Sequence, residues 1–309
     1  MKDVLLRATS QNGEVRIFAV SSLEIATYEK EIHALAPGAS IALGRALSAV
    51  LMMGAMLKNE GDTISLQFRG NGPLRTILVQ GNAKGECRGY VGDPNADFDE
   101  AHPNVGALLG KGELTLTRDM GLKEPYVSTI NLHSGEIAED LTYYFYESEQ
   151  TPSSVGLGVL LNEKGTIVSS GGFLVQLMPG CGKETIDLLE QNLQKVHAVT
   201  DHLSDNDPEA LLSLILGELG IANLEKISVK ASCNCSRERS KRMLKTMGKR
   251  SSKKRPKKAR NSACVAPSAP PNIPSRRRKS HRLRAKWANK CSKKVLFCPI
   301  LLCVYSQSE

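Results

Sequence analysis

The sequence predicts an α+β fold in which sheets dominate and helices cover them. Short apolar runs bounded by Gly, Asn or Pro recur between residues 4 and 178, as expected for strands. Segments with apolar residues three and four positions apart, typical of helices, lie between these runs. With 309 residues, 41% of them hydrophobic, the chain is long enough for about two domains with a sizeable core.

The first elements are a hairpin and two helices. Apolar runs at 4–8 and 15–20 flank Asn12-Gly13, which favours a tight turn between two strands. Ser21 or Ser22 can cap a first helix, which Pro37-Gly38 is expected to end. Its core face is predicted to contain Leu23, Ala26, Ile32 and Leu35. A second helix is expected from Ser40 to Leu57, and its apolar composition predicts that it is buried.

The middle of the chain alternates in the manner of half-buried strands. Strands are predicted at 63–68, 74–80, 86–91, 114–118, 126–130, 155–161 and 167–178, and helices at 105–109 and 136–149. Cys87 stands alone in one of these strands and is expected to be buried.

Beyond Pro179-Gly180 the pattern becomes helical. One helix carries Ile186, Leu189, Leu193 and Val196 on a single face. In the next helix, Asp207 is the expected cap, Pro208 the first residue and Gly220 the residue just past the end. Its leucines surround much of its circumference, so it needs cover on more than one side. Ordinary core packing and a sticky surface exposed when the cover is removed both explain this pattern.

Charge divides the chain into two unlike parts. Residues 250–309 contain seventeen of the 41 Lys and Arg residues and one of the 32 acidic residues. The remaining 1–249 therefore carry 24 basic and 31 acidic side chains, so the net charge of +9 comes from the tail. The tail is rich in Ser, Lys, Arg and Pro and is expected to be disordered.

Several classes of protein are not favoured. Charges interrupt every apolar run near the N-terminus, and no run of about 18 uncharged apolar residues occurs, so a cytoplasmic protein without a membrane span is expected. The six histidines are scattered, and no Gly-x-Ser-x-Gly motif is present. We therefore expect a protein that is not an enzyme.

Cys233 and Cys235 form the one motif whose spacing implies chemistry. The preceding residues 227–230 alternate like a strand, on which residues i and i+2 face the same side. Arg237 and Arg239 favour the thiolate form of both cysteines. Two adjacent thiolates either bind a soft metal or are oxidised.

Five motifs of residues 1 to about 249 occur together in a known order: 70–74 (GNGPL), 88–91 (RGYV), 170–176 (SGGFLVQ), Pro179-Gly180 and 233–239 (CNCSRER). In these motifs the chain resembles the redox-regulated 33-kilodalton heat-shock chaperone family of bacteria. The resemblance implies a holdase that binds unfolding client proteins and prevents their aggregation. It also implies a homodimer when active, a zinc ion in the reduced form, and oxidation to disulfides that unfolds the zinc domain and the adjacent linker.

The resemblance also implies a domain organisation. Residues 1–179 correspond to the chaperone core, 180–231 to a helical linker, and 232–249 to a remnant of the redox domain. Residues 250–309 form the basic tail. Cys233 and Cys235 are then metal ligands and the redox-active pair.

The second half of the family's zinc motif is missing. The family has a Cys-x-x-Cys about 30 residues after the first pair, whereas here Cys264 is followed by Val265-Ala266-Pro267. Cys264 is therefore at most a third ligand, and weak or absent zinc binding and an impaired switch are expected. Without an intact zinc domain, the linker helices at 183–219 are expected to lose their cover, so that the protein holds clients even when reduced. The abrupt loss of pattern suggests a shifted reading frame. The alternative hypothesis is a nucleic-acid-binding protein that uses the basic tail.

Overall fold

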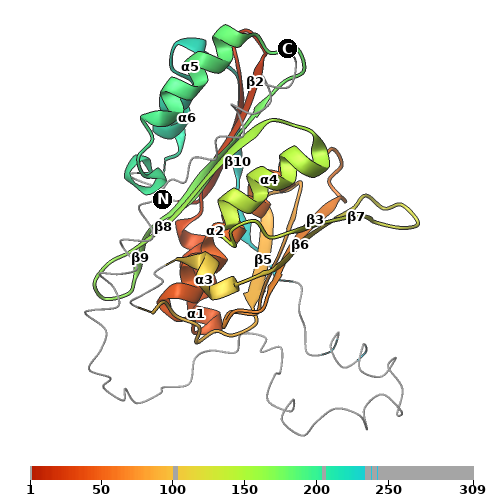
Figure 1. The fold of residues 1–309 in the computed structure, drawn as a ribbon, viewed down its shortest axis with the longest axis vertical. Helices are drawn as coiled ribbons and strands as arrows, with labels where there is room; N and C mark the ends of the chain where they lie inside the picture. Colours follow the sequence, from red (N-terminus) through yellow and green to blue (C-terminus); the bar gives the residue numbers. More distant parts are fainter. Residues whose placement is uncertain (1, 100–103, 204–206, 234–237, 239–241, 243–309) are drawn as a thin grey trace, which may run out of the picture. The chain divides into compact units, whose positions relative to one another are not determined.

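The computed structural model describes residues 2–99, 104–203 and 207–233, together with Glu238 and Arg242. The described residues up to Ala231 belong to one compact unit built from two sheets and their covering helices (Figure 1). The predicted α+β class is confirmed. The basic tail, and with it the expectation that it is disordered, lies outside the described residues.

The first sheet, here called sheet A, has five antiparallel strands in the order β10-β1-β2-β9-β8. Their bounds are β1 (Val4–Ser10), β2 (Val15–Ser21), β8 (Ser153–Leu161), β9 (Ile167–Leu177) and β10 (Ile221–Ser228). The predicted hairpin around Asn12-Gly13 is confirmed as β1–β2, and Gly13 has the positive φ of 74° that such turns require. Strand β10 pairs with β1, so this sheet joins the two ends of the described chain.

The second sheet, sheet B, has six strands in the order β11-β5-β4-β3-β6-β7. They are β3 (Thr63–Gly70), β4 (Thr76–Asn82), β5 (Glu86–Val91), β6 (Gly112–Asp119), β7 (Tyr126–Asn131) and β11 (Lys230–Ala231). Buried and half-buried residues alternate along β3 and β4, as the sequence pattern predicts for a sheet with one covered face.

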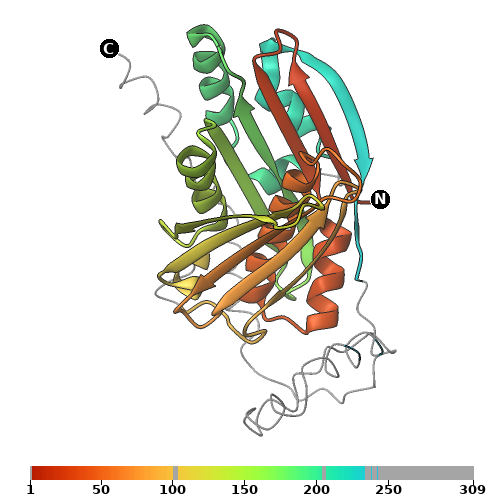
Figure 2. The same cartoon turned by 90° about the vertical axis from the view of Figure 1, so that its right-hand side faces the viewer.

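Helix α2 (Pro37–Gly54) contacts strands of both sheets, and all of its residues except Pro37 are buried (Figures 1 and 2). Its glycines allow close approach, since a Cβ on Gly54 would lie 2.7 Å from the carbonyl oxygen of Asn82 in β4. By length and apolar composition α2 is the one described helix that would suffice to cross a membrane. Its burial instead identifies it as the central core helix.

The boundaries of the first two helices differ from the prediction. Helix α1 spans Leu23–His33, and Pro37 begins α2 instead of ending α1. Proline suits the first position of a helix because its missing N–H is not needed there. Ile32, predicted on the core face, is 41% exposed, because α1 turns Ile25, Ala26 and Glu29 inward.

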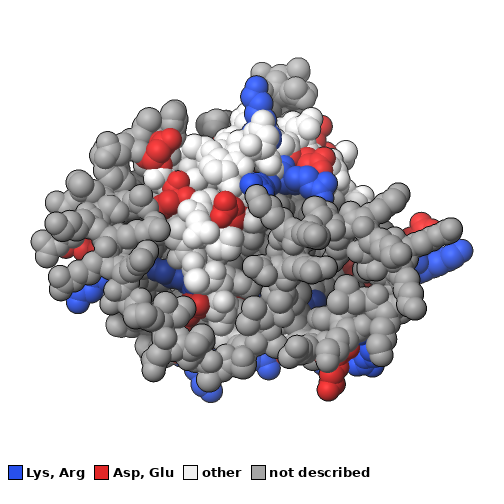
Figure 3. Space-filling view, turned by 90° about the horizontal axis from the view of Figure 1, so that it is seen from below, with Lys and Arg blue, Asp and Glu red and all other residues white. Residues whose placement is uncertain are grey.

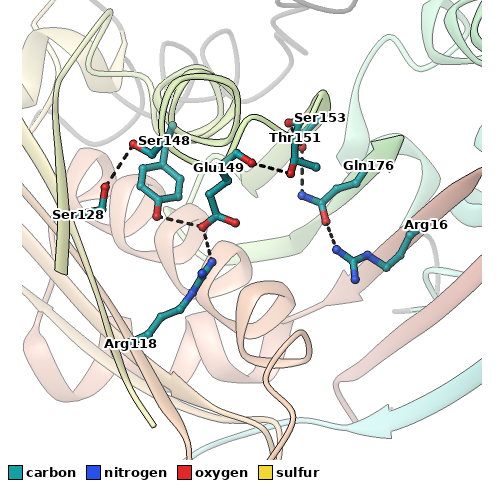
Figure 4. Close-up of polar contacts among 9 residues, drawn as sticks. Arg16, Arg118, Ser128, Ser148, Glu149, Thr151, Ser153 and Gln176 are labelled. Carbon is teal, nitrogen blue, oxygen red and sulfur yellow. Dashed lines mark hydrogen bonds and ion pairs between the residues drawn. The ribbon is translucent and has the colours of Figure 1, made fainter. Parts of the chain in front are cut away.

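Helices α3 (Val105–Leu109) and α4 (Ile137–Glu149) lie where the sequence predicts them. Polar contacts surround the C-terminal end of α4 (Figure 4). Glu149 accepts hydrogen bonds from Arg118 of β6 and from Tyr144, the latter at 3.0 Å. Nearby, Gln176 of β9 accepts from Arg16 of β2 at 2.6 Å and donates to Ser153 of β8 at 3.1 Å. Side-chain hydrogen bonds thus link β2, β9 and β8 within sheet A. A separate contact links the end of α4 to β6 of sheet B.

Residues 180–231 are only partly helical. Helix α5 (Lys183–Gln194), the 3-10 turn η1 (Val199–His202), helix α6 (Glu209–Leu216) and the turn η3 (Gly217–Leu219) are followed by β10 and β11. The expected helical linker therefore ends in two strands, because its last residues alternate and pair with β1 and β5. The proposed division at residue 179 stays a prediction.

The central position of α2 yields a stability prediction. Leu47 is fully buried in α2, so Leu47→Ala should lower the free energy of unfolding by about 2–5 kcal/mol through lost burial and the cavity left behind. Ile32→Ala, at an exposed position of α1, is the matched control and should change it little. Urea denaturation followed by circular dichroism measures both, and equal effects of the two substitutions would contradict the central role of α2.

Candidate client-binding surface and redox switch

The face of sheet A that points away from α2 is apolar. In β2, Phe18 and Val20 belong to the core around α2, while Val15, Ile17 and Ala19 belong to a second, separate cluster. The other strand residues of this second cluster are Val4, Leu6, Ala8, Phe173, Val175 and Leu177. Because both faces of the sheet are buried, β9 is a nearly continuous buried run, unlike the alternating strands of sheet B.

Helices α5 and α6 cover this outer face of sheet A. Leu189 and Leu193 of α5 and Leu211, Leu212 and Ile215 of α6 are fully buried against it. Figure 2 shows these teal and green helices beside the red strands β1 and β2. We expected the linker helices to lose their cover without an intact zinc domain. This expectation is wrong, because sheet A itself buries their apolar sides.

The segment that leads to Cys233 is attached to sheet B by a short contact. In β11, Lys230 and Ala231 pair in parallel with Glu86 and Cys87 of β5. The amide of Lys230 donates to the carbonyl of Gly85 at 3.0 Å, and its ammonium lies 3.2 Å from Glu86. The ion pair between Lys230 and Glu86 stabilises the folded state only modestly, because the lysine side chain is largely exposed to water.

Cys233 follows two residues after β11, and its side chain is exposed. An exposed position is what reaction with a dissolved oxidant requires. Cys235 and Cys264 lie outside the described residues, so whether the three cysteines come together stays a prediction.

Two other described cysteines have environments that disfavour oxidation. Cys87 is buried as predicted, and desolvation, with smaller effects of Glu29 and Asp3, raises the pKa of its thiol. Cys181 is half-buried before α5, and burial together with the nearby Glu14 carboxylate raises its pKa as well. Since the thiolate is the reactive form, the raised pKa values of Cys87 and Cys181 make both poor candidates for a redox-active cysteine.

The two thiolates of the Cys233 motif suit zinc in type, and a closed site would need further donors. Thiolates are preferred zinc ligands, and a closed structural site needs four donors in a tetrahedron. The described residues contain no group of three or more His, Cys, Asp or Glu side chains able to hold a metal. The motif itself supplies Cys233 and Cys235, with Cys264 as the candidate third. A fourth donor would have to come from Cys291, Cys298, a histidine or another chain, so weak zinc binding stays a prediction.

Asp3 is a buried residue that the sequence pattern did not reveal. Its carboxylate accepts from the amides of Glu24 at 3.0 Å and Ile25 at 2.8 Å, which caps α1 from the start of β1. Its carbonyl accepts from the amide of Val229 at 3.3 Å, between β10 and β11. Burial raises the pKa of Asp3 to about 6, against the opposing effect of the two amides. An acidic residue near a chain terminus carries no periodic signal that would indicate this role.

On the face seen in Figure 3, the described residues carry both signs of charge. In Figure 3, which views the molecule from below Figure 1, described Lys and Arg side chains stand among Asp and Glu. In this view the described residues do not resemble the one-sided basic face of a typical nucleic-acid-binding domain.

The helical cover can be loosened by one substitution. Leu212→Ala in α6 should destabilise the packing on sheet A by about 2–5 kcal/mol and increase binding of a hydrophobic dye such as bis-ANS, because apolar strand residues become accessible. Leu224→Ala in β10, where Leu224 is 47% exposed, is the control of the same chemistry and should leave dye binding unchanged. Unchanged dye binding by the Leu212 variant would argue against a detachable cover.

Comparison with known proteins places this arrangement in a family. The family model described as "Hsp33 protein" matches residues 3–262. A 33 kDa chaperonin of Thermoanaerobacter sp. (strain X514) is 43% identical over 254 residues, which cover 81% of this chain and 86% of the relative. A 33 kDa chaperonin of Clostridium botulinum (strain Langeland) is 40% identical over 255 residues, with the same coverage.

A solved structure supports the same assignment. The crystal structure of the 33 kDa chaperonin (heat shock protein 33 homolog) from Thermotoga maritima matches with a TM-score of 0.76 and 32% identity. The match covers 81% of this chain and 87% of the other. With its two sheets, its central helix and its helical cover, the chain belongs to the Hsp33 family of molecular chaperones.

Proposed function

We propose that this chain is a redox-regulated holdase that binds unfolding client proteins and prevents their aggregation. One observation carries the proposal: among the described residues, a large apolar face of sheet A is covered by the short helices α5 and α6 and the turns beside them. Exposed apolar surface of this kind is what a holdase needs to capture apolar segments of a client. The covered arrangement is then the closed form.

The attachment of the linker supports regulation from the Cys233 end. Strand β11 has two paired residues, far fewer than the other strands, so it is a weak point at which local unfolding begins at little cost. Loss of this pairing leaves β10 as the next element, and β10 leads directly to η3 and α6. Local unfolding that begins at Cys233 therefore has to pass through only β11 and β10 before it reaches η3 and α6.

The chemistry of the switch rests on Cys233 and Cys235. Oxidation converts the two thiols to a disulfide while peroxide is reduced to water. A disulfide between residues two apart closes a small, strained ring and is easily reduced. Zinc, when bound, would hold these thiolates and couple metal binding to local folding. With Cys264 as the only further cysteine near the family's spacing, weak zinc binding and an impaired switch are proposed.

Several finer points accompany the proposal. The active form is proposed to be a homodimer, and the protein is expected in the cytoplasm and without enzymatic activity. The family resemblance supports these points.

An aggregation assay tests the proposed function. The reduced full-length chain should suppress aggregation of chemically unfolded citrate synthase weakly, because α5 and α6 cover sheet A, and peroxide should add a modest gain that Cys233→Ser abolishes. Cys181→Ser is the matched control and should retain that gain. Zinc measured on the same samples should be well below one ion per chain. Tightly bound stoichiometric zinc, lost on oxidation together with a large rise in activity, would show that the switch is intact.

Nucleic-acid binding through the basic tail remains the alternative, favoured by the seventeen basic residues of 250–309. It predicts binding to double-stranded DNA that weakens steeply as salt rises and vanishes on truncation after Gly248. Electrophoretic mobility shifts at several salt concentrations measure this. Binding that survives the truncation would assign it to the folded part instead.

A further inference from the structure

The tip of the β1–β2 hairpin touches both ends of the helical cover. This tip consists of residues 10–14, between the two strands of sheet A. One set of its contacts reaches residues 178–185, where the chain enters α5. Another reaches Leu219 and Gly220, where the chain leaves η3 for β10. A single turn therefore holds the beginning and the end of a segment of about forty residues.

The contact with the start of α5 is a charge-assisted network. The Glu14 carboxylate accepts hydrogen bonds from the hydroxyl of Thr185 and, at 3.0 Å, from the side-chain amide of Asn12. The Asn12 amide also donates to the Thr185 hydroxyl at 2.9 Å. The backbone of Met178 donates to the Glu14 carbonyl at 2.8 Å. Thr185 is buried, so its hydroxyl has exchanged water for these partners.

The hairpin turn holds its own members in place for this contact. The hydroxyl of Ser10 donates to the Asn12 side chain at 2.6 Å, and the amide of Glu14 donates to the same oxygen at 3.1 Å. These hydrogen bonds within the hairpin tip orient Asn12 and Glu14 independently of their contact with α5. Such preorganisation reduces the entropy lost when the contact forms.

The contact with the end of the cover is made by the backbone and by close packing. The amide of Gln11 donates to the carbonyl of Leu219 at 3.0 Å. The Gln11 side chain lies over Gly220, where an added Cβ would come within 2.5 Å of its Cδ atom. Gly220 has a φ of 65°, so it provides both the turn and the space at this point.

We propose that the hairpin tip 10–14 is a latch that keeps the helical cover closed on sheet A in the reduced protein, with the Glu14–Asn12–Thr185 contact as its polar catch. The proposal rests on the proposed function, because the cover is taken to be what hides the client-binding surface. The latch lies at the turn between β1 and β2, and none of its residues belongs to the cysteine motif. Its release by substitution should therefore open the cover without any oxidant.

Thr185 offers a matched set of variants in the full-length chain. Thr185→Val removes the hydroxyl but keeps the shape of the side chain, whereas Thr185→Ser retains the hydroxyl. Glu14→Ala removes the acceptor from the other side. Glu184→Ala removes an exposed acidic residue from the same first turn of α5 and serves as the control for general effects on the helix end.

Amide hydrogen exchange of the reduced protein is the primary measurement. In the Thr185→Val and Glu14→Ala variants, amides of both α5 and α6 should exchange about tenfold faster, because one charge-assisted hydrogen bond is lost from a segment that opens as a unit. Amides of α2 and β3 should be unaffected in all variants. Thr185→Ser and Glu184→Ala should exchange like the wild type.

Three results would overturn the latch. Unchanged exchange in α5 and α6 would show that the catch contributes nothing to closure. Faster exchange confined to the first turn of α5, with α6 unchanged, would show local fraying instead of release of the cover. Additivity of the effects of Thr185→Val and Glu14→Ala in the double variant would also contradict a shared contact, because coupled residues give non-additive changes.

Holdase activity of the same reduced samples separates the latch from the proposed function. Accelerated exchange together with stronger suppression of citrate synthase aggregation supports both. Accelerated exchange with unchanged suppression supports the latch and shows that the surface under the cover does not bind clients. The two hypotheses therefore fail by different results.

Discussion

Burial of helix α2 between two sheets is the constraint on which the rest of the structure depends. Both sheets must turn an apolar face to the same helix, so β3 and β4 alternate while Phe18 and Val20 of sheet A point inward. The apolar surface removed from water around α2 is the main source of stability. Glycines at the closest approaches, such as Gly54 beside Asn82, let the backbones come near enough to exclude voids.

The second apolar cluster, on the outer face of sheet A, is separate from the core around α2. It shares no residue with the cluster around α2, although both include side chains of the same strands. Alternation along a strand produces this separation, because neighbouring residues point to opposite faces of sheet A. Opening the outer cluster therefore need not disturb the inner one. A chaperone built in this way can expose sheet A and remain folded around α2, which is the physical requirement for reversible client binding.

The cover is held by a small number of specific contacts at its ends. Lys230 and Ala231 attach its C-terminal side to β5, and the hairpin tip meets both Thr185 and Leu219. Polar contacts of this kind add only modest free energy each, whereas the buried apolar side chains of α5 and α6 contribute the larger part of the stability of the closed form. Cys233 lies next to one of these attachments, and Cys87 and Cys181 are protected by burial and neighbouring carboxylates. Cys233 thus lies two residues along the chain from β11, the shortest of the described strands.

The sequence by itself determined the features that depend on local pattern. Strand β5, helix α3 and the hairpin at Asn12-Gly13 follow from alternation, helical spacing and turn chemistry, and all three lie as predicted. The motif at Cys233 and the resemblance to the family were also visible in the residues alone. Pro37, however, begins α2 where an end of α1 was expected, because proline is compatible with both positions.

Only the tertiary structure decided which surfaces meet. Pairing of β10 with β1, the roles of Asp3 and Glu14, and the burial of α5 and α6 on sheet A join residues that are distant in the chain. The pattern of α6 showed that the helix needs cover, and it contained nothing to distinguish a sheet of the same domain from a separate zinc domain. Periodicity records that a side chain is buried, while the identity of its neighbours depends on the order of strands across the sheets.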